Sequence, residues 1–204
     1  MSLSGIEMIQ RRKAARPRDG RTDAYSSLID ELRASLDSLA RADPDEAEIA
    51  QLRHAVAAIR SISDRTPVPE EQRLWGFWRT DRSRAQCMVP ELRHDELGEF
   101  SYRGKVTIGD FFLGMNDAAH GGVVALLFDD VLGLLAGSGR SPGRTAYLNT
   151  TFRAVTPIGV ELEVRAGIDR IDGRKRFVSG QILHDGVLCA EAEALIVELR
   201  AEHR

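Results

Sequence analysis

Residues 120–136 read HGGVVALLFDDVLGLLA, an apolar run that only two acids interrupt after its first residue. From Val123 to Ala136 every residue is apolar or glycine, except Asp129 and Asp130. A helix that is apolar on all sides is normally buried at the centre of its domain, so the stretch predicts one central helix. Its acids need an explanation, because a buried carboxylate is costly unless it is paired, hydrogen-bonded or exposed to a functional cavity.

The two acids point in different directions from this helix. At about 100° per residue, Asp129 lies in the middle of a narrow stripe of small side chains. The stripe consists of Gly122, Ala125, Asp129, Gly133 and Ala136. Small side chains let another group come close, so we assign the chemistry to Asp129. Asp130 points among larger apolar side chains and is assigned a structural role, with a hydrogen-bonding or cationic partner in this chain or across a subunit boundary.

The segment before the helix, residues 116–122, reads NDAAHGG. Glycines let the backbone approach a ligand closely, and free N–H groups at a helix N-terminus attract negative charge. Such groups could hold a carbonyl oxygen that becomes negative during a reaction. A turn that caps the helix, with the ring of the histidine hydrogen-bonded, explains His120-Gly121-Gly122 about as well as a ligand site does. With a helix start near Gly121, Asp129 lies about 12 Å along the axis from the N-terminus, so a ligand that touches both ends must bend.

The first third of the chain is expected to be a tail and two helices. Residues 1–21 are basic and show no apolar period, which indicates a mobile tail. Residues 22–72 are expected to form a helical hairpin and a linker. Thr22 or Asp23 can cap the first helix, and Pro44 can open the second. The apolar positions are Tyr25, Leu28, Ile29, Leu32, Leu36 and Leu39, then Ile49, Leu52, Val56 and Ile59. These stripes must pack on the main domain, on each other or on a partner subunit.

Residues 73–204 are expected to form one α+β domain. Strand-like stretches at about 85–92 and 98–108 precede the central helix. Four more such runs follow it, at about 145–155, 160–171, 174–184 and 187–199. Asp172-Gly173 and Asp185-Gly186 favour tight hairpins between the last three runs. The pattern predicts an antiparallel meander in the C-terminal half and a sheet that curls around the helix.

Composition restricts the function classes. The chain has 204 residues, 43% of them hydrophobic, and its net charge of -3 provides no electrostatic basis for binding nucleic acid. It contains neither the roughly 18-residue apolar run of a membrane span nor a signal peptide, so we expect a cytoplasmic protein without a membrane partner. Cys87 and Cys189 are expected in or near the core. The five histidines show no HExxH or HxH pattern, so we expect no metal centre and no cofactor.

On these residues the sequence resembles the hotdog thioesterase superfamily, and within it the PaaI-type acyl-CoA thioesterases. The likeness is carried by His120-Gly121-Gly122, by Asp129 nine positions after the histidine, and by Thr145-Ala146-Tyr147-Leu148-Asn149 at the start of the next strand. It covers residues 73–200 and excludes the N-terminal hairpin. The resemblance implies a hotdog fold, in which an antiparallel sheet wraps around a central helix. It also implies hydrolysis of an acyl-CoA to a carboxylic acid and coenzyme A.

The resemblance implies a role for each candidate catalytic residue. Asp129 is expected to be the general base or the nucleophile. The backbone N–H of Gly121 is expected to polarise the thioester oxygen. Thr145 is expected to orient the attacking water across a dimer interface. His120 is expected to orient the ligand, unless it only caps the helix.

Partners and substrate contacts follow from the same resemblance. Two subunits pair edge to edge and build each active site together, so a homodimer or homotetramer is expected. Asn116 and Gly122 are further candidates for substrate contact. Basic residues near the pocket mouth could pair with the phosphates of coenzyme A, and we select Arg144 and Arg153 among them. The full set is Arg140, Arg144, Arg153, Arg174, Lys175 and Arg176.

Two other functions stay open. One is a non-catalytic acyl-CoA or lipid-binding module whose helical hairpin contacts a partner; the acid at Asp129 argues against it. The other is a hotdog hydratase or dehydratase, which normally needs an Asp and His pair in a motif that this sequence lacks. The resemblance selects neither the acyl group nor coenzyme A over acyl carrier protein as the thioester donor.

Overall fold

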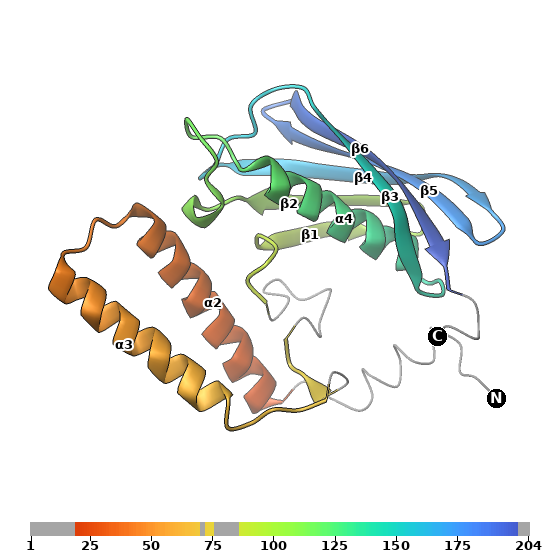
Figure 1. The fold of residues 1–204 in the computed structure, drawn as a ribbon. Coiled ribbons are helices and arrows are strands. Elements are labelled where there is room, and N and C mark those ends of the chain that lie inside the picture. The colour runs from red at the N-terminus through yellow and green to blue at the C-terminus, as the bar shows by residue number, and fades with distance from the viewer. Residues whose placement is uncertain (1–18, 70–71, 76–85, 200–204) are drawn as a thin grey trace.

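A computed structural model describes residues 19–69, 72–75 and 86–199 of the chain. A six-stranded antiparallel sheet wraps around helix α4 (Gly121–Gly137), as Figure 1 shows. The strands are β1 (Leu92–Leu97), β2 (Ser101–Thr107), β3 (Gly143–Phe152), β4 (Glu161–Asp172), β5 (Lys175–His184) and β6 (Val187–Glu198). Their order in space is β1-β2-β4-β5-β6-β3. The predicted α+β fold with a central helix is confirmed.

Helix α4 is buried because its apolar side chains fill the concave face of the sheet. Phe128, Leu132 and Leu135 are fully buried in the core cluster. A side chain at Gly180 on β5 would meet Phe128 and Leu132 at 3.2 Å, so this glycine lets α4 lie close to the sheet. Each large apolar side chain buried in this way typically contributes about 1.5 to 3 kcal/mol. The layer between helix and sheet therefore holds α4, and the carboxylates on it, in a fixed position.

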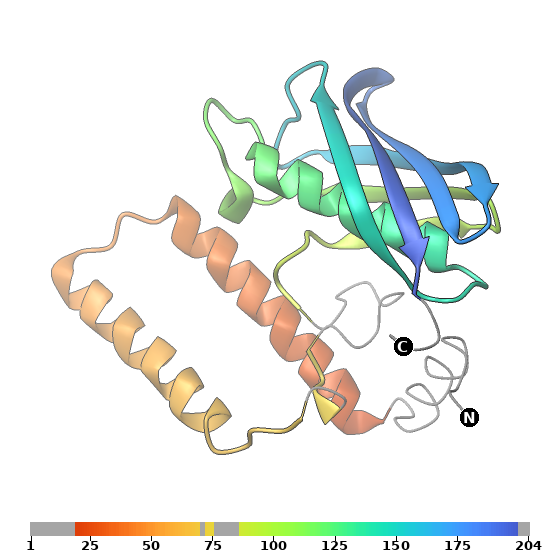
Figure 2. The ribbon, with the colours of Figure 1, turned by 45° about the vertical axis from the view of Figure 1, so that its right-hand side comes forward.

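Strand β3 lies where the prediction did not place it. Strands β4, β5 and β6 form the expected meander, but β3 pairs with β6 and not with β4. It therefore forms one edge of the sheet, as Figure 2 shows. The predicted meander is wrong for this strand, because the chain after β3 runs past the N-terminal end of α4. There the N–H of Ala119 donates to the carbonyl of Thr156 at 2.8 Å.

The strand predicted at residues 85–92 is also wrong. Only Leu92 of that range belongs to β1, and the described residues before it form bends and irregular structure. Cys87 and Val89 are buried without strand pairing, which explains the misleading apolar pattern. Strand β1 is a charged edge strand whose only buried residue is Leu92, so its own sequence does not alternate.

The two Asp-Gly pairs mark tight hairpins, one of them shifted by a residue. Asp185 and Gly186, with φ of 48° and 80°, form the turn between β5 and β6 as predicted. Between β4 and β5, Asp172 still pairs with Lys175, so the turn consists of residues 173–174. Gly173 has a φ of 56° there, which glycine adopts without strain.

Helices α2 (Gly20–Arg41) and α3 (Glu46–Ser63) form an antiparallel hairpin beside the sheet domain (Figures 1 and 2). Helix α2 packs on the domain through Ile29, which is 2% exposed, whereas α3 buries no residue. Of the packing partners considered for the hairpin, α2 therefore uses the main domain. The predicted tail, residues 1–21, falls mostly outside the described residues. None of the described helices is long and apolar enough to cross a membrane.

The caps of these helices differ from those predicted. The carboxylate of Asp19 accepts the N–H of Thr22 at 2.9 Å, so Asp19 is the N-cap of α2 in place of Thr22 or Asp23. The hydroxyl of Thr22 completes the capping box by accepting the N–H of Asp19 at 2.8 Å. Asp45 caps α3 in the same way, and Pro44 precedes this helix instead of opening it. Asp19 lies three positions before Thr22 and four before Asp23, and Asp45 lies one position after Pro44. Both aspartates have the extended backbone that a cap requires.

Candidate active site

Asp129 lies on the exposed side of α4, opposite strand β3. The hydroxyl of Thr145 donates a hydrogen bond of 2.8 Å to Oδ1 of Asp129. The structure thus brings these two candidates together within one chain. In the part of the chain that is described, no other hydrogen bond to this carboxylate is found, so Oδ2 is available as a proton acceptor.

The small-residue stripe of α4 is the accessible face of the helix over most of its length. Gly122 and Asp129 are exposed, and Ala125 and Gly133 are half-buried. Only Ala136, near the C-terminal end, is buried. The carboxylate of Asp129 is therefore not sealed by its neighbours. Asp130 is 8% exposed and lies in the core, where it faces away from this surface.

His120 caps α4 with its ring. Its Nδ1 accepts the N–H of Gly122 at 3.0 Å, and its carbonyl accepts the N–H of Val123 at 2.9 Å. The N–H of Gly122 is therefore occupied by the cap. Among the described residues no acceptor contacts the N–H of Gly121, which leaves it as the donor at this helix end. The capping role leaves Nε2 of His120 for contact with a ligand.

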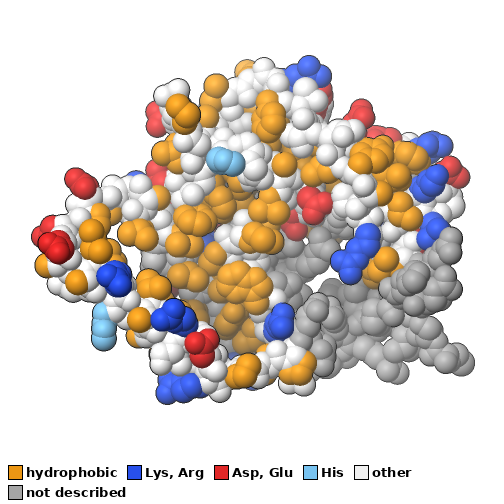
Figure 3. Space-filling model, viewed as in Figure 1, with side chains coloured by type: hydrophobic (Ala, Val, Ile, Leu, Met, Phe, Trp, Pro, Cys, Tyr) orange, Lys and Arg blue, Asp and Glu red, His pale blue; other side chains and the backbone are white. Residues whose placement is uncertain are grey.

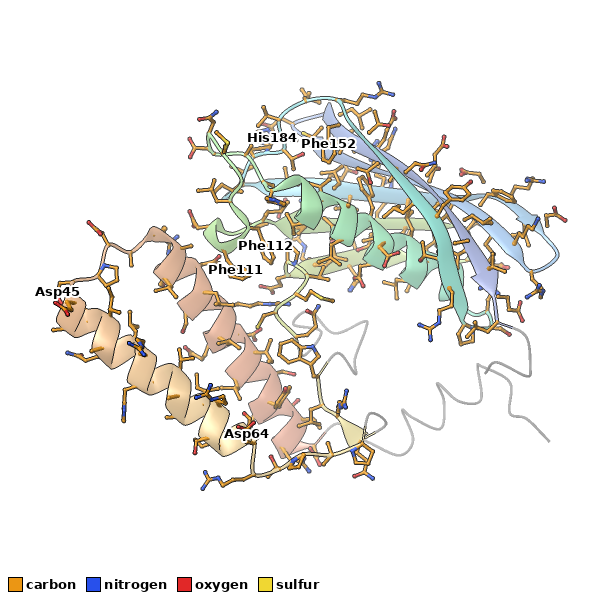
Figure 4. All side chains as sticks on the ribbon, viewed as in Figure 1. Asp45, Asp64, Phe111, Phe112, Phe152 and His184 are labelled. Carbon is orange, nitrogen blue, oxygen red and sulfur yellow. The ribbon has the colours of Figure 1, made fainter. Side chains whose placement is uncertain are left out.

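Phe152 covers the same helix end, and sequence reasoning missed it. A Cβ atom at Gly121 would meet the ring tip of Phe152 at 3.2 Å, and the ring itself is 54% exposed. Figure 4 shows Phe152 on β3, near the start of α4. A bulge between Thr145 and Tyr147 shifts the alternation of β3 by one residue. Phe152 therefore faces the helix together with Thr145, although strict alternation from Thr145 puts it on the opposite face.

The loop before α4 is a small hairpin that ends in the capping histidine. Asn116 and Asp117 have φ of 52° and 57°, and the N–H of Ala118 donates to the carbonyl of Met115 at 3.1 Å. Left-handed backbone is a sufficient reason for asparagine at this position. Asn116 is exposed at the tip of the turn. No described contact joins it to Asp129 or Thr145.

The basic residues predicted to bind the phosphates of coenzyme A differ in the contacts that their side chains already make. Arg144 is exposed, and no partner for its guanidinium is found among the described residues. Arg153 is paired with Glu191 and lines a 460 Å³ groove on the outer face of the sheet. Arg176 is buried and donates to the carbonyls of Ala136 and Ser141 at 3.0 and 2.7 Å, so it cannot meet a phosphate without breaking these bonds.

Of the three remaining basic candidates, Arg140 and Arg174 have partners among the described residues. Arg140 donates to the carbonyl of Glu99 at 2.8 Å and stacks over Phe100 at 5.0 Å. Arg174 donates to the carbonyl of Glu198 at 2.9 Å. Lys175 is exposed at the start of β5.

The two cysteines are buried, as the sequence predicts. Burial raises the pKa of the Cys87 thiol and that of the Cys189 thiol. Both groups therefore stay protonated at neutral pH and are poor nucleophiles. The accessible carboxylate of Asp129 is the better candidate for chemistry.

Comparison with known proteins identifies thioesterases with a similar fold. A crystal structure described as a thioesterase superfamily protein is 30% identical, with a TM-score of 0.72, and the match covers 85% of this chain and 94% of that one. The chain belongs to the thioesterase superfamily. A match over 85% of the chain exceeds what residues 73–204 supply, so this superfamily member also resembles the chain in the N-terminal helices.

Other matches cover only part of the chain. Acyl-coenzyme A thioesterase THEM4 is 29% identical over 96 residues in Bos taurus and 34% identical over 91 residues in Mus musculus. These matches cover 46% and 44% of this chain, and the chain spans only 39% of the length of each of these relatives. A Streptococcus mutans protein bound to acetyl CoA shares the fold, with a TM-score of 0.50 over 52% of this chain and 86% of that one, at 16% identity. No family model matches the sequence.

Proposed function

We propose that this protein is an acyl-CoA thioesterase of the PaaI type, which hydrolyses an acyl-CoA to a free carboxylic acid and coenzyme A. The observation that carries the proposal is the accessible carboxylate of Asp129 on an otherwise buried helix, with the hydroxyl of Thr145 on one of its oxygens. The names of the curated relatives and the acetyl CoA in the Streptococcus mutans neighbour support the same substrate class.

The chemistry uses the N-terminus of α4, at Gly121, and the carboxylate in its middle, at Asp129. The thioester oxygen accepts the N–H of Gly121, where the positive end of the helix dipole favours developing negative charge. Oδ2 of Asp129 takes a proton from water while the water oxygen attacks the carbonyl carbon. The tetrahedral intermediate then collapses, the C–S bond breaks, and the proton passes to the departing thiolate. In the alternative route the carboxylate attacks the carbonyl carbon directly, the C–S bond breaks as the thiolate of coenzyme A leaves, and water hydrolyses the resulting anhydride.

The separation of the two groups favours a site that two subunits share. Gly121 and Asp129 are about 12 Å apart along the helix axis, whereas the oxyanion donor and the base act on the two sides of one carbonyl group. Each site therefore combines Gly121 of one protomer with Asp129 of the partner subunit. This requires a homodimer at least, and a homotetramer is compatible with it.

The free edge of the sheet supports such pairing. Strand β3 leaves one row of backbone N–H and C=O groups without a strand partner in the described part of the chain, and proteins normally cover such an edge. Tyr147, Phe152 and Val155, on or next to this strand, are 41%, 54% and 66% exposed. Figure 3 shows apolar side chains spread over the face that carries α2, α3 and α4. A second copy that pairs along β3 covers this edge.

Coenzyme A also needs a partner for its phosphates. Arg144 is our choice, because its charge is unused and it neighbours Thr145 on the edge strand. Arg153 must first break its ion pair with Glu191 before it can bind a phosphate of coenzyme A.

The test is a thiol-release assay with Asp129→Asn and Asp129→Ala over short, medium, long and aromatic acyl-CoAs. We expect turnover to fall by at least about 100-fold, the usual contribution of a general base. Asp169→Asn is the matched control, because Asp169 also accepts a 2.8 Å hydrogen bond from a hydroxyl, that of Ser179. Near wild-type turnover in the folded Asp129 variants contradicts the proposal. Tight acyl-CoA binding without hydrolysis by the wild type supports the binding-module alternative.

A further inference from the structure

The N-terminal helix α2 contacts the segment that leads into the active-site loop. The carboxylate of Asp37 on α2 accepts the backbone N–H of Phe111 at 2.9 Å. Phe111 belongs to the short 3-10 helix η2 (Asp110–Phe112). A Cβ atom at Gly109 would overlap the carboxylate of Asp37, so a side chain here would displace the carboxylate from its present position. Figure 4 shows Phe111 and Phe112 between α2 and the start of α4.

Two further contacts fix α2 in this place. Arg33 donates to the carbonyls of Gln86 and Val89 at 2.6 and 3.1 Å. Arg41 forms a 2.8 Å ion pair with Asp110 of η2, but its side chain is 62% exposed. Exposed pairs of this kind contribute little. Among the described residues, Asp37 is the side chain of α2 that bonds to the backbone of η2.

A continuous series of hydrogen bonds leads from η2 to the catalytic end of α4. The carbonyl of Phe112, the last residue of η2, accepts the N–H of His120 at 2.8 Å. The ring of His120 then holds the N–H of Gly122. Gly121 lies between these two bonded residues, so its N–H direction is set by both. A displacement of η2 is expected to move this donor.

From this series we infer that Asp37 is a positioning residue, which fixes the N-terminal turn of α4 and thereby aims the N–H of Gly121. The inference rests on the proposed function for its catalytic consequence. It assigns a role to the N-terminal helix: α2 supports the donor that meets the thioester oxygen. Asp37 does not touch the substrate.

The kinetic test compares Asp37→Ala with Asp37→Asn in the full chain. Alanine removes the acceptor, and we expect kcat to fall about 10-fold with little change in KM, because small misplacement of a catalytic group is costly. Asparagine keeps an oxygen in the same place and is expected to restore kcat to within about 2-fold. Asp45→Ala is the matched control, since Asp45 also accepts a backbone N–H at 2.9 Å, that of Glu48, at the far end of the hairpin (Figure 4). Equal kcat values for Asp37→Ala and Asp45→Ala overturn the inference.

A second measurement does not depend on activity. Amide hydrogen exchange by NMR reports on the N–H groups of His120 and Gly122, both hydrogen-bonded at the helix end. We expect exchange there to be at least about 10-fold faster in Asp37→Ala than in Asp45→Ala, with the interior of α4 unchanged. Equal exchange in the two variants overturns the inference, even if the wild type hydrolyses acyl-CoA. Faster exchange supports it, even if the wild type hydrolyses none and the proposed function fails.

Discussion

Thr145 donates a 2.8 Å hydrogen bond to Oδ1 of Asp129 and so ties the edge strand β3 to the central helix within one chain. The bond selects one orientation of the carboxylate and leaves Oδ2 free for water. Both residues are exposed in the single chain, and a second copy along β3 would cover them. This relationship makes Thr145 the first residue to test after Asp129.

Replacing Thr145 with valine removes the hydroxyl and keeps the branched shape. We expect kcat to fall about 10-fold, because hydrogen bonds to charged groups are among the stronger ones. Steady-state kinetics with the best acyl-CoA measures the change. Ser179→Ala, which removes the equivalent bond to Asp169 on the outer face of the sheet, is expected to leave kcat unchanged. Similar losses in both variants would assign the effect to general destabilisation.

Proline at position 121 removes the proposed oxyanion donor itself. Gly121 is the first residue of α4, where proline is well tolerated, and His120 before it already has the extended backbone that proline requires. We expect Gly121→Pro to lower kcat by about 100-fold or more while the protein stays folded. Gly121→Ala keeps the N–H and meets the same Phe152 ring, so it is the control for crowding. If alanine and proline have the same effect, the N–H is not the donor.

Arg176 is predicted to matter for stability and not for substrate binding. Its guanidinium is buried, donates to two carbonyls and pairs with Glu198 at 3.1 Å. Arg176→Ala removes these three interactions, and we expect the free energy of unfolding to fall by about 3 kcal/mol. Arg174→Ala in the same hairpin loses one exposed bond and should cost less than about 0.5 kcal/mol. Urea unfolding followed by circular dichroism distinguishes the two outcomes.

Much of the fold follows from local patterns in the sequence. The all-apolar run around Asp129 specifies a central helix, because only the middle of a domain accommodates such a helix. The alternation of Ala190, Ala192 and Ala194 with glutamates specifies a strand with one buried face, and β6 has that pattern. Asp129 could be singled out from the stripe of small residues alone, and the structure leaves it accessible.

The features that the sequence did not predict depend on contacts between distant parts of the chain. The edge strand β1 is charged, so its sequence carries no alternation that could distinguish it from a loop. The bulge in β3 moves every later residue to the opposite face of the strand. Strict alternation counted from Thr145 therefore does not identify Phe152 as a residue that faces the helix. Asp37 and Phe111 lie 74 positions apart in the sequence. A single hydrogen bond between such distant residues produces no periodic pattern in the sequence.

The requirement for two subunits in each site has a sharp test in mixed oligomers. Asp129→Asn lacks the base and Gly121→Pro lacks the donor, so each variant alone is expected to be inactive. In a dimer of one with the other, one site combines the intact Gly121 of the first subunit with the intact Asp129 of the second, and the other site lacks both groups. After subunit exchange at equal concentrations, half of the dimers are mixed, so about one quarter of the wild-type activity should return. If both groups act within one chain, no mixture regains activity. The separation of about 12 Å along one helix leads us to expect recovery.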